Sequence, residues 1–208
     1  MSALPAGPGD VLAVWTSGSL EADLIRAAEA VEGKPAVANH VVIITHQDSR
    51  HRWIGIQGQP GGVGLCDCTP YLSDSRTRSN HLQPRLNDIP RYHDDALHTS
   101  ALMSGGQLPA LLAACAKSMG IGYDWVGIAE DGLAALHAED LSAAIDLLWR
   151  WPASASGLLP GHVVCSSLAA MLYDLPAVGW KHPDLGTERK CEPSDWWDWS
   201  DRQLWKTA

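Results

Sequence analysis

The sequence has no phenylalanine and is short of basic side chains. Lys and Arg together number 15, against 24 Asp and Glu, which gives a formal net charge of −9. A protein that binds nucleic acid normally gathers Lys and Arg on one face. The acidic balance therefore argues against nucleic acid as a partner. The missing phenylalanine says nothing about chemistry.

Long apolar runs are also missing, because no stretch approaches the length needed to span a bilayer. The first ten residues lack the charged and apolar regions of a signal peptide. No stretch is both basic and amphipathic, which argues against binding to a membrane surface. We therefore expect a protein without a membrane span that is synthesised in the cytoplasm.

The five cysteines form no recognisable framework. Their number is odd, their spacing does not repeat, and Cys66-Asp-Cys68 is not a CxxC motif, so free thiols are expected rather than disulfides. With 208 residues, 46% of them hydrophobic, the chain can form a single domain over residues 1–208. It has no internal repeat. A long polar loop is expected at about 73–98 and a Trp-rich C-terminal tail at about 186–208.

Hydrophobic periodicity predicts an α+β domain with a small antiparallel sheet packed against helices. The expected strands cover residues 11–15, 40–46 and 52–57, with a turn at 60–62. One helix is expected to begin at Leu20 and to end before Gly33. Two more helices are expected at 108–119 and 133–151. A last helix should start near Cys165, with one stripe formed by Leu168, Met171, Leu172 and Leu175.

Cys165 is the candidate nucleophile, because it alone among the cysteines is placed at the start of a predicted helix. Unpaired backbone N–H groups at that position favour a thiolate. Cys115 lies inside an apolar helix and is expected to be inert. The alternative for Cys165 is a small buried hydrophobic residue, which is what most free cysteines are.

A nucleophilic cysteine also needs an imidazole and a third polar group that holds the ring. His40 on one predicted strand and Gln57 on the next can supply both, because neighbouring strands lie about 4.8 Å apart. His46, six residues further along, is expected on the same face and is the rival base.

Five segments, taken together and in order, resemble the circularly permuted NlpC-type branch of papain-like cysteine hydrolases. The resemblance covers about residues 9–185, and His before Cys is the permuted order. The segments are Gly9-Asp10 with its strand, Asn39-His-Val-Val-Ile43, Ile56-Gln-Gly-Gln-Pro-Gly-Gly-Val63, Tyr123-Asp-Trp125 and Cys165-Ser-Ser-Leu168.

The resemblance implies that Cys165 attacks a carbonyl, His40 transfers the proton and Gln57 is the third residue. Relatives commonly carry Glu at that third position, so activity here is expected to be reduced or absent. The oxyanion donors should include the backbone N–H of Cys165. Tyr123 is a candidate second donor, although an aromatic packed on the core is favoured.

The implied substrate is an amide in a peptide or in peptidoglycan stem peptides, and no cofactor is expected. Similar domains are encoded by phages of GC-rich bacteria and are often tail-associated, which implies a virion location. The alternative is an inactive structural protein of a virion tail on the same fold, or a free bacterial hydrolase.

Two further hypotheses come from residues outside this triad. A zinc site would use Cys66, Cys68, His81, His93, Asp94 and His98, but their spacing fits no strong template, so no metal is expected. The tryptophans at 196, 197, 199 and 205 either cover the domain core or bind other tail proteins. Ser194 and Asp195 are expected to cap a short helix there.

Overall fold

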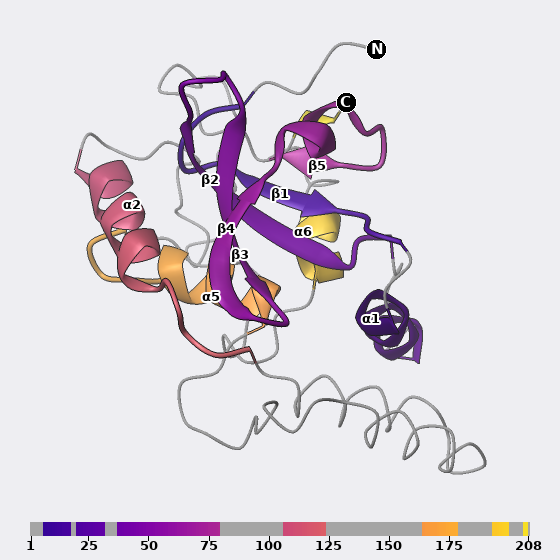
Figure 1. Ribbon diagram of the computed structural model, residues 1–208. Helices are drawn as coiled ribbons and strands as arrows, with labels where there is room; N and C mark the ends of the chain where they lie inside the picture. The colour runs from indigo at the N-terminus through magenta and orange to yellow at the C-terminus, as the bar shows by residue number, and fades with distance from the viewer. Residues whose placement is uncertain are drawn as a thin grey trace, which may run out of the picture.

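The computed structural model describes residues 6–17, 20–31, 37–79, 106–123, 164–178, 193–199 and 206–207. The described part is an α+β arrangement in which helices pack on an antiparallel sheet (Figure 1). The sheet has six strands in the order β4-β3-β2-β1-β5-β6. No helix in these residues is long and apolar enough to cross a membrane.

The first three of the four long strands correspond to the strands predicted at 11–15, 40–46 and 52–57. β1 (Val11–Val14), β2 (His40–Gln47), β3 (Trp53–Gln59) and β4 (Gly62–Asp67) are joined as antiparallel neighbours. His40 opens β2 opposite Val14, and Gln57 on β3 lies opposite Gly64. A register shift between Ile44 and His46 interrupts the pairing of β2 with β3.

Alternation along the strands gives the sheet two buried faces. The first face carries Val11, Ala13, Val41, Ile43 and Ile56. The second face carries Leu12, Val14, Val42 and Ile44, together with Cys68 and Leu72. Because residues 41–44 are all buried, the prediction of a strand covered on both sides is confirmed.

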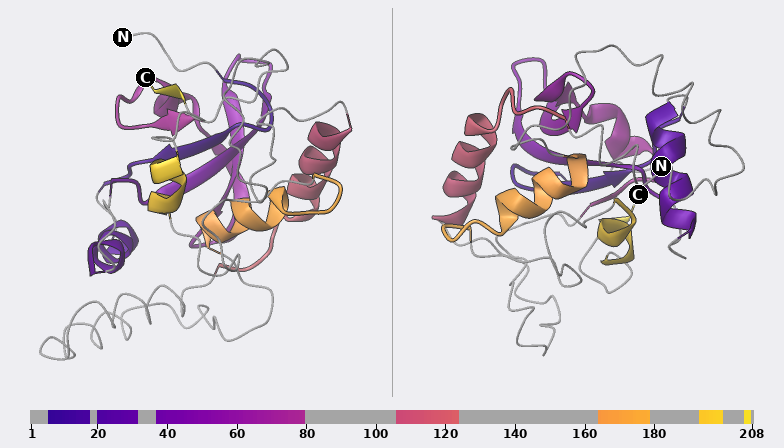
Figure 2. Two further views of the ribbon diagram at one scale, coloured as in Figure 1. Left: turned by 180° about the vertical axis from the view of Figure 1, so that it is seen from behind. Right: turned by 90° about the horizontal axis from the view of Figure 1, so that it is seen from below.

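Helices α5 (Cys165–Tyr173) and α6 (Pro193–Trp199) cover the first face. α5 packs on β2 and β3, and α6 packs on β1 and β2, with α2 (Gln107–Lys117) beside α5. The second face is covered by the 3₁₀ helix η1 (Thr69–Ser73). Figure 2 shows α5 and α6 on the same side of the sheet and α1 (Leu20–Val31) at its end.

Tyr173 anchors the far end of α5. Its hydroxyl donates a hydrogen bond to the carbonyl of Gly9, just before β1. Its ring meets Trp196 of α6 edge-on, with centroids 6.0 Å apart, and Trp196 is fully buried. For Trp196, the prediction that the C-terminal tryptophans cover the core is therefore confirmed.

Two sequence expectations need correction. Met171 and Leu175 are 43% and 36% exposed, so the predicted apolar stripe on α5 is only half right. Leu168 and Leu172 of the stripe are buried, and so are the small residues Ser166, Ser167, Ala169 and Ala170. The segment expected to be a loop from 73 contains the short strand β5 (Arg78–Ser79), which pairs with β6 (Lys206–Thr207). The predicted helix at 133–151 lies outside the described residues.

Candidate active site

The candidate site lies where β2 begins and β3 ends. Asn39, directly before His40, closes this end of the sheet against Thr16 after β1. Its Oδ1 accepts hydrogen bonds from the backbone N–H and hydroxyl of Thr16 at 2.8 and 3.0 Å, and its Nδ2 donates to the Thr16 carbonyl at 2.7 Å. These bonds, with Asn39 itself buried, fix the backbone from which the His40 ring projects.

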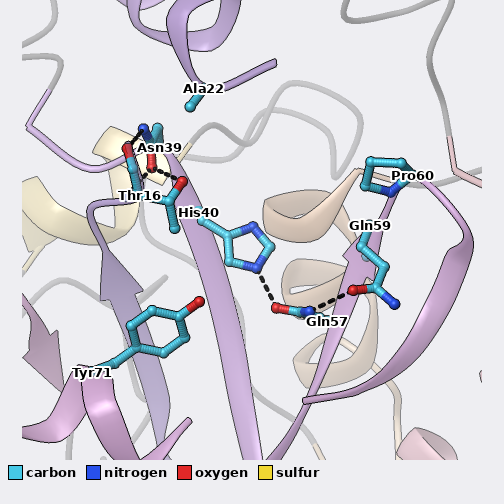
Figure 3. A pocket seen from close by; sticks show the side chains of 9 residues that line it. Thr16, Ala22, Asn39, His40, Gln57, Gln59, Pro60 and Tyr71 are labelled. Carbon is cyan, nitrogen blue, oxygen red and sulfur yellow. Dashed lines mark hydrogen bonds between the residues drawn. The ribbon is translucent and has the colours of Figure 1, made fainter. Parts of the chain in front are cut away.

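His40 and Gln57 are in direct contact, as predicted. Nε2 of His40 lies 2.7 Å from Oε1 of Gln57, and Figure 3 shows the two side chains pointing toward one another. Because an amide oxygen only accepts, Nε2 must carry the proton in this bond. The other ring nitrogen, Nδ1, then holds the lone pair and is the basic atom.

Gln59 extends this contact by one more hydrogen bond. Nε2 of Gln57 donates to Oε1 of Gln59 at 2.7 Å, so the three side chains form a row (Figure 3). Gln57 and Gln59 are two residues apart on β3 and therefore share a face of the strand. The row runs from His40 on β2 to the last residue of β3.

Burial changes the protonation of His40. Desolvation lowers the pKa of its imidazole from 6.5, and the hydrogen bond that the ring donates to Gln57 offsets only part of that effect. The ring is therefore held neutral at neutral pH, which is the form that a general base needs.

We predict a pKa below 6.5 for His40 in an NMR titration of the native protein, and a higher value for the same ring in urea. The direction in which the free energy of unfolding changes with pH follows from this difference. Above pH 6.5 both states are neutral, and as the pH falls the unfolded chain takes up the proton first. The protein therefore loses stability as the pH falls from 6.5 to the lower pKa of His40 in the folded state. This loss should be smaller in His40→Gln. A native pKa at or above 6.5 would contradict the prediction.

Cys165 begins α5, as predicted from the sequence. Val164 precedes it in an extended conformation and gives the helix no side-chain cap, which leaves the positive end of the helix at the cysteine. Cys165 is buried. The start of α5 lies against Gly58 of β3, where an added Cβ would come within 3.1 Å of the Cys165 nitrogen and 3.3 Å of its Cα.

Gly58 links the start of α5 to a pocket of about 170 Å³. Its described lining comes entirely from the first part of the chain: Thr16, Ala22, Asn39, His40, Gln57, Gly58, Gln59, Pro60 and Tyr71. The Tyr71 hydroxyl points into it (Figure 3). No side chain in this described lining is charged near neutral pH, since His40 is held neutral, so the pocket suits an uncharged polar group.

The two parts of the candidate site lie on opposite faces of the sheet, because His40 pairs with Val14 of the second face and Cys165 belongs to the first face. Gly55 faces Val42 and Cys68 on the second face of the sheet, and alternation places Gln57 on that same face. Gly58 faces α5 on the first face. The structure therefore brings His40 and Gln57 together and sets Cys165 behind Gly58, outside the described lining of the pocket.

The other candidate site residues, His46 and Tyr123, are not part of the described lining of the pocket. His46 is exposed beyond the register shift in β2, paired with Ile54, so the expected alternation from His40 does not hold. Tyr123 is buried and is not among the described residues that line the pocket, in agreement with the favoured core role.

The described cysteines other than Cys165 are poor nucleophiles. Burial raises the pKa of Cys66, Cys68 and Cys115 to about 12 each, and the Cys68 thiol donates to the Trp53 carbonyl at 3.1 Å. Within the described ranges no three His, Cys, Asp or Glu residues form a metal-binding group. The remaining ligands of the zinc hypothesis, His81, His93, Asp94 and His98, lie outside those ranges.

No family model, curated protein or solved structure matches this chain. The site is therefore interpreted from its own geometry.

The sequence prediction missed two parts of the site. Gln59 could have been found from its two-residue spacing from Gln57, since such residues share a strand face. Tyr71 could not have been found in this way, because it enters the pocket from a 3₁₀ helix with no periodic signal.

Proposed function

We propose that this protein is a cysteine hydrolase of the permuted NlpC type within the papain-like fold, and that it cleaves an amide bond. Cys165 is the nucleophile, His40 the general base and Gln57 the residue that orients the imidazole. The observation that carries the proposal is the 2.7 Å bond between His40 and Gln57, in a pocket separated from Cys165 by a glycine.

In the proposed reaction, the Cys165 thiol gives its proton to Nδ1 of His40 and the thiolate attacks the carbonyl carbon of the amide. The tetrahedral intermediate collapses, the imidazolium protonates the departing amine, and the acyl group stays on sulfur as a thioester. Water then loses a proton to the same nitrogen and attacks the thioester, which releases the acid. The returned proton restores the thiol.

Three features support these roles. The start of α5, which has no side-chain cap, favours an anionic sulfur at residue 165. The lowered pKa of His40 supplies a neutral base. The reaction further requires the sulfur to reach the ring around the end of β3, and Gly58, which has no side chain, lets the start of α5 approach this part of the strand.

The substrate that fits this proposal is an uncharged amide in a peptide, and the resemblance favours the stem peptides of peptidoglycan. A phage tail is the proposed setting, with other tail proteins as partners through the Trp-rich C-terminus. Because Trp196 is buried within the domain, such contacts would fall to other residues of that tail.

We predict that the purified chain releases new amine and carboxylate termini from peptidoglycan sacculi or synthetic stem peptides, as detected by mass spectrometry. Cys165→Ser and His40→Ala should lose the activity, the latter by at least ~100-fold, as is typical for a general base. His46→Ala is the matched control and should cleave as wild type does. If the folded wild-type chain cleaves neither sacculi nor peptides, the inactive scaffold of a virion tail becomes the better assignment.

A further inference from the structure

The side chain of Gln57 poses a problem that a carboxylate would not. A carboxylate presents two equivalent oxygens, whereas an amide presents one oxygen and one NH₂ group. Only the orientation with the oxygen toward His40 keeps the proton on Nε2 and the lone pair on Nδ1. The reversed amide would donate to Nε2 and move the proton to Nδ1, which removes the base.

Gln59 makes the contact that orients the Gln57 amide. Its Oε1 accepts the Nε2–H of Gln57 at 2.7 Å, at the opposite end of the amide from His40. With Gln59 in its observed orientation, a reversed Gln57 amide would place its oxygen against the oxygen of Gln59 at that distance, which is repulsive. The contact therefore favours the orientation in which Oε1 of Gln57 meets the ring.

The neighbouring strand leaves room for this arrangement. Gly64 on β4 lies opposite Gln57, and a Cβ added at Gly64 would come within 3.2 Å of Nε2 of Gln59. The absence of a side chain at Gly64 lets the Gln59 amide lie over β4 with its oxygen toward Gln57. Both glutamines are only partly buried, so substitutions there are tolerated better than in the core.

We propose that Gln59 is a positioning residue, which orients the Gln57 amide and so sets the tautomer of His40. The inference deepens the proposed function, because this tautomer is the one that the hydrolase needs. Its physical basis is the row of hydrogen bonds from Gln59 to Gln57 to His40.

The test is the nitrogen-15 NMR spectrum of the His40 ring in the full-length chain above pH 6.5, where burial keeps the ring neutral. In wild type, the Nε2 and Nδ1 resonances should be those of a ring protonated at Nε2. Gln59→Leu should move both resonances toward the average of the two tautomers and slow alkylation of Cys165 roughly tenfold, as loss of an orienting partner typically does. Gln59→Glu keeps an acceptor and should preserve the wild-type tautomer.

Gln57→Glu provides the matched background. With a symmetric carboxylate at residue 57, adding Gln59→Leu should leave the ring resonances unchanged. Wild-type resonances in Gln59→Leu, or an equal shift in the Gln57→Glu background, would overturn the inference. If the tautomer responds as expected while Cys165 stays unreactive in every variant, Gln59 keeps its role and the hydrolase proposal fails.

Discussion

In a Cys191→Ser background, iodoacetamide at neutral pH is expected to alkylate Cys165 far faster than any other thiol. The described competitors, Cys66, Cys68 and Cys115, have pKa values raised to about 12, so only on the order of one thiol in 10⁵ is ionised at pH 7. Peptide mapping by mass spectrometry measures each rate. Cys191 is removed because it lies outside the described residues.

His40→Ala is expected to slow the alkylation of Cys165 by roughly 100-fold, because the thiol loses the base that takes its proton. Gln57→Leu should have a smaller effect in the same direction, since it releases the ring without removing it. His46→Ala removes an exposed imidazole from the same strand and should leave the rate unchanged. Uniformly slow labelling of all thiols would contradict the assignment of Cys165 and His40 as a pair.

Trp196→Ala is expected to lower the free energy of unfolding by about 3–5 kcal/mol, the range for truncating a fully buried aromatic. Trp196 is 0% exposed, belongs to the core cluster on the first face of the sheet, and contacts the Tyr173 ring edge-on. Its removal therefore opens a cavity between α6 and α5. Urea unfolding followed by circular dichroism measures the change.

Leu65→Ala is the control, because Leu65 is 52% exposed on β4 and its truncation should change the free energy of unfolding by less than about 0.5 kcal/mol. A tail that serves only as an interface makes the opposite prediction for Trp196. In that case Trp196→Ala would leave the unfolding curve in place and weaken binding to another protein.

The sequence was sufficient to predict the elements whose patterns are local. The β-branched run from Val41 to Ile44 fixed a central strand, and the apolar spacing after Leu20 fixed α1. The start of α5 at Cys165 was also predicted correctly. The prediction failed for Met171, which is exposed on α5, and for Leu175, which is exposed beyond the end of the helix, although both match the spacing of a helical stripe.

The pairing of strands that lie far apart in the chain could not be predicted from local sequence patterns. β5 and β6 each cover two residues and come from segments that lie far apart in the chain, so neither has a periodic signal of its own. The contact of His40 with Gln57 was predictable from strand adjacency alone, whereas the register shift that removes His46 was not. The close approach of Gly58 to Cys165 depends on helix placement, which periodicity does not determine.

The pocket and the first four strands are made from the first third of the chain, yet the apolar face that they present is covered by α5 and α6 from its last quarter. During ribosomal synthesis, the strands that carry this face, with Val41, Ile43 and Ile56, are therefore made long before the helices that cover it. Exposed strands of this kind aggregate readily. The emerging N-terminal part is therefore expected to be most prone to aggregation until α5 and α6 have been synthesised.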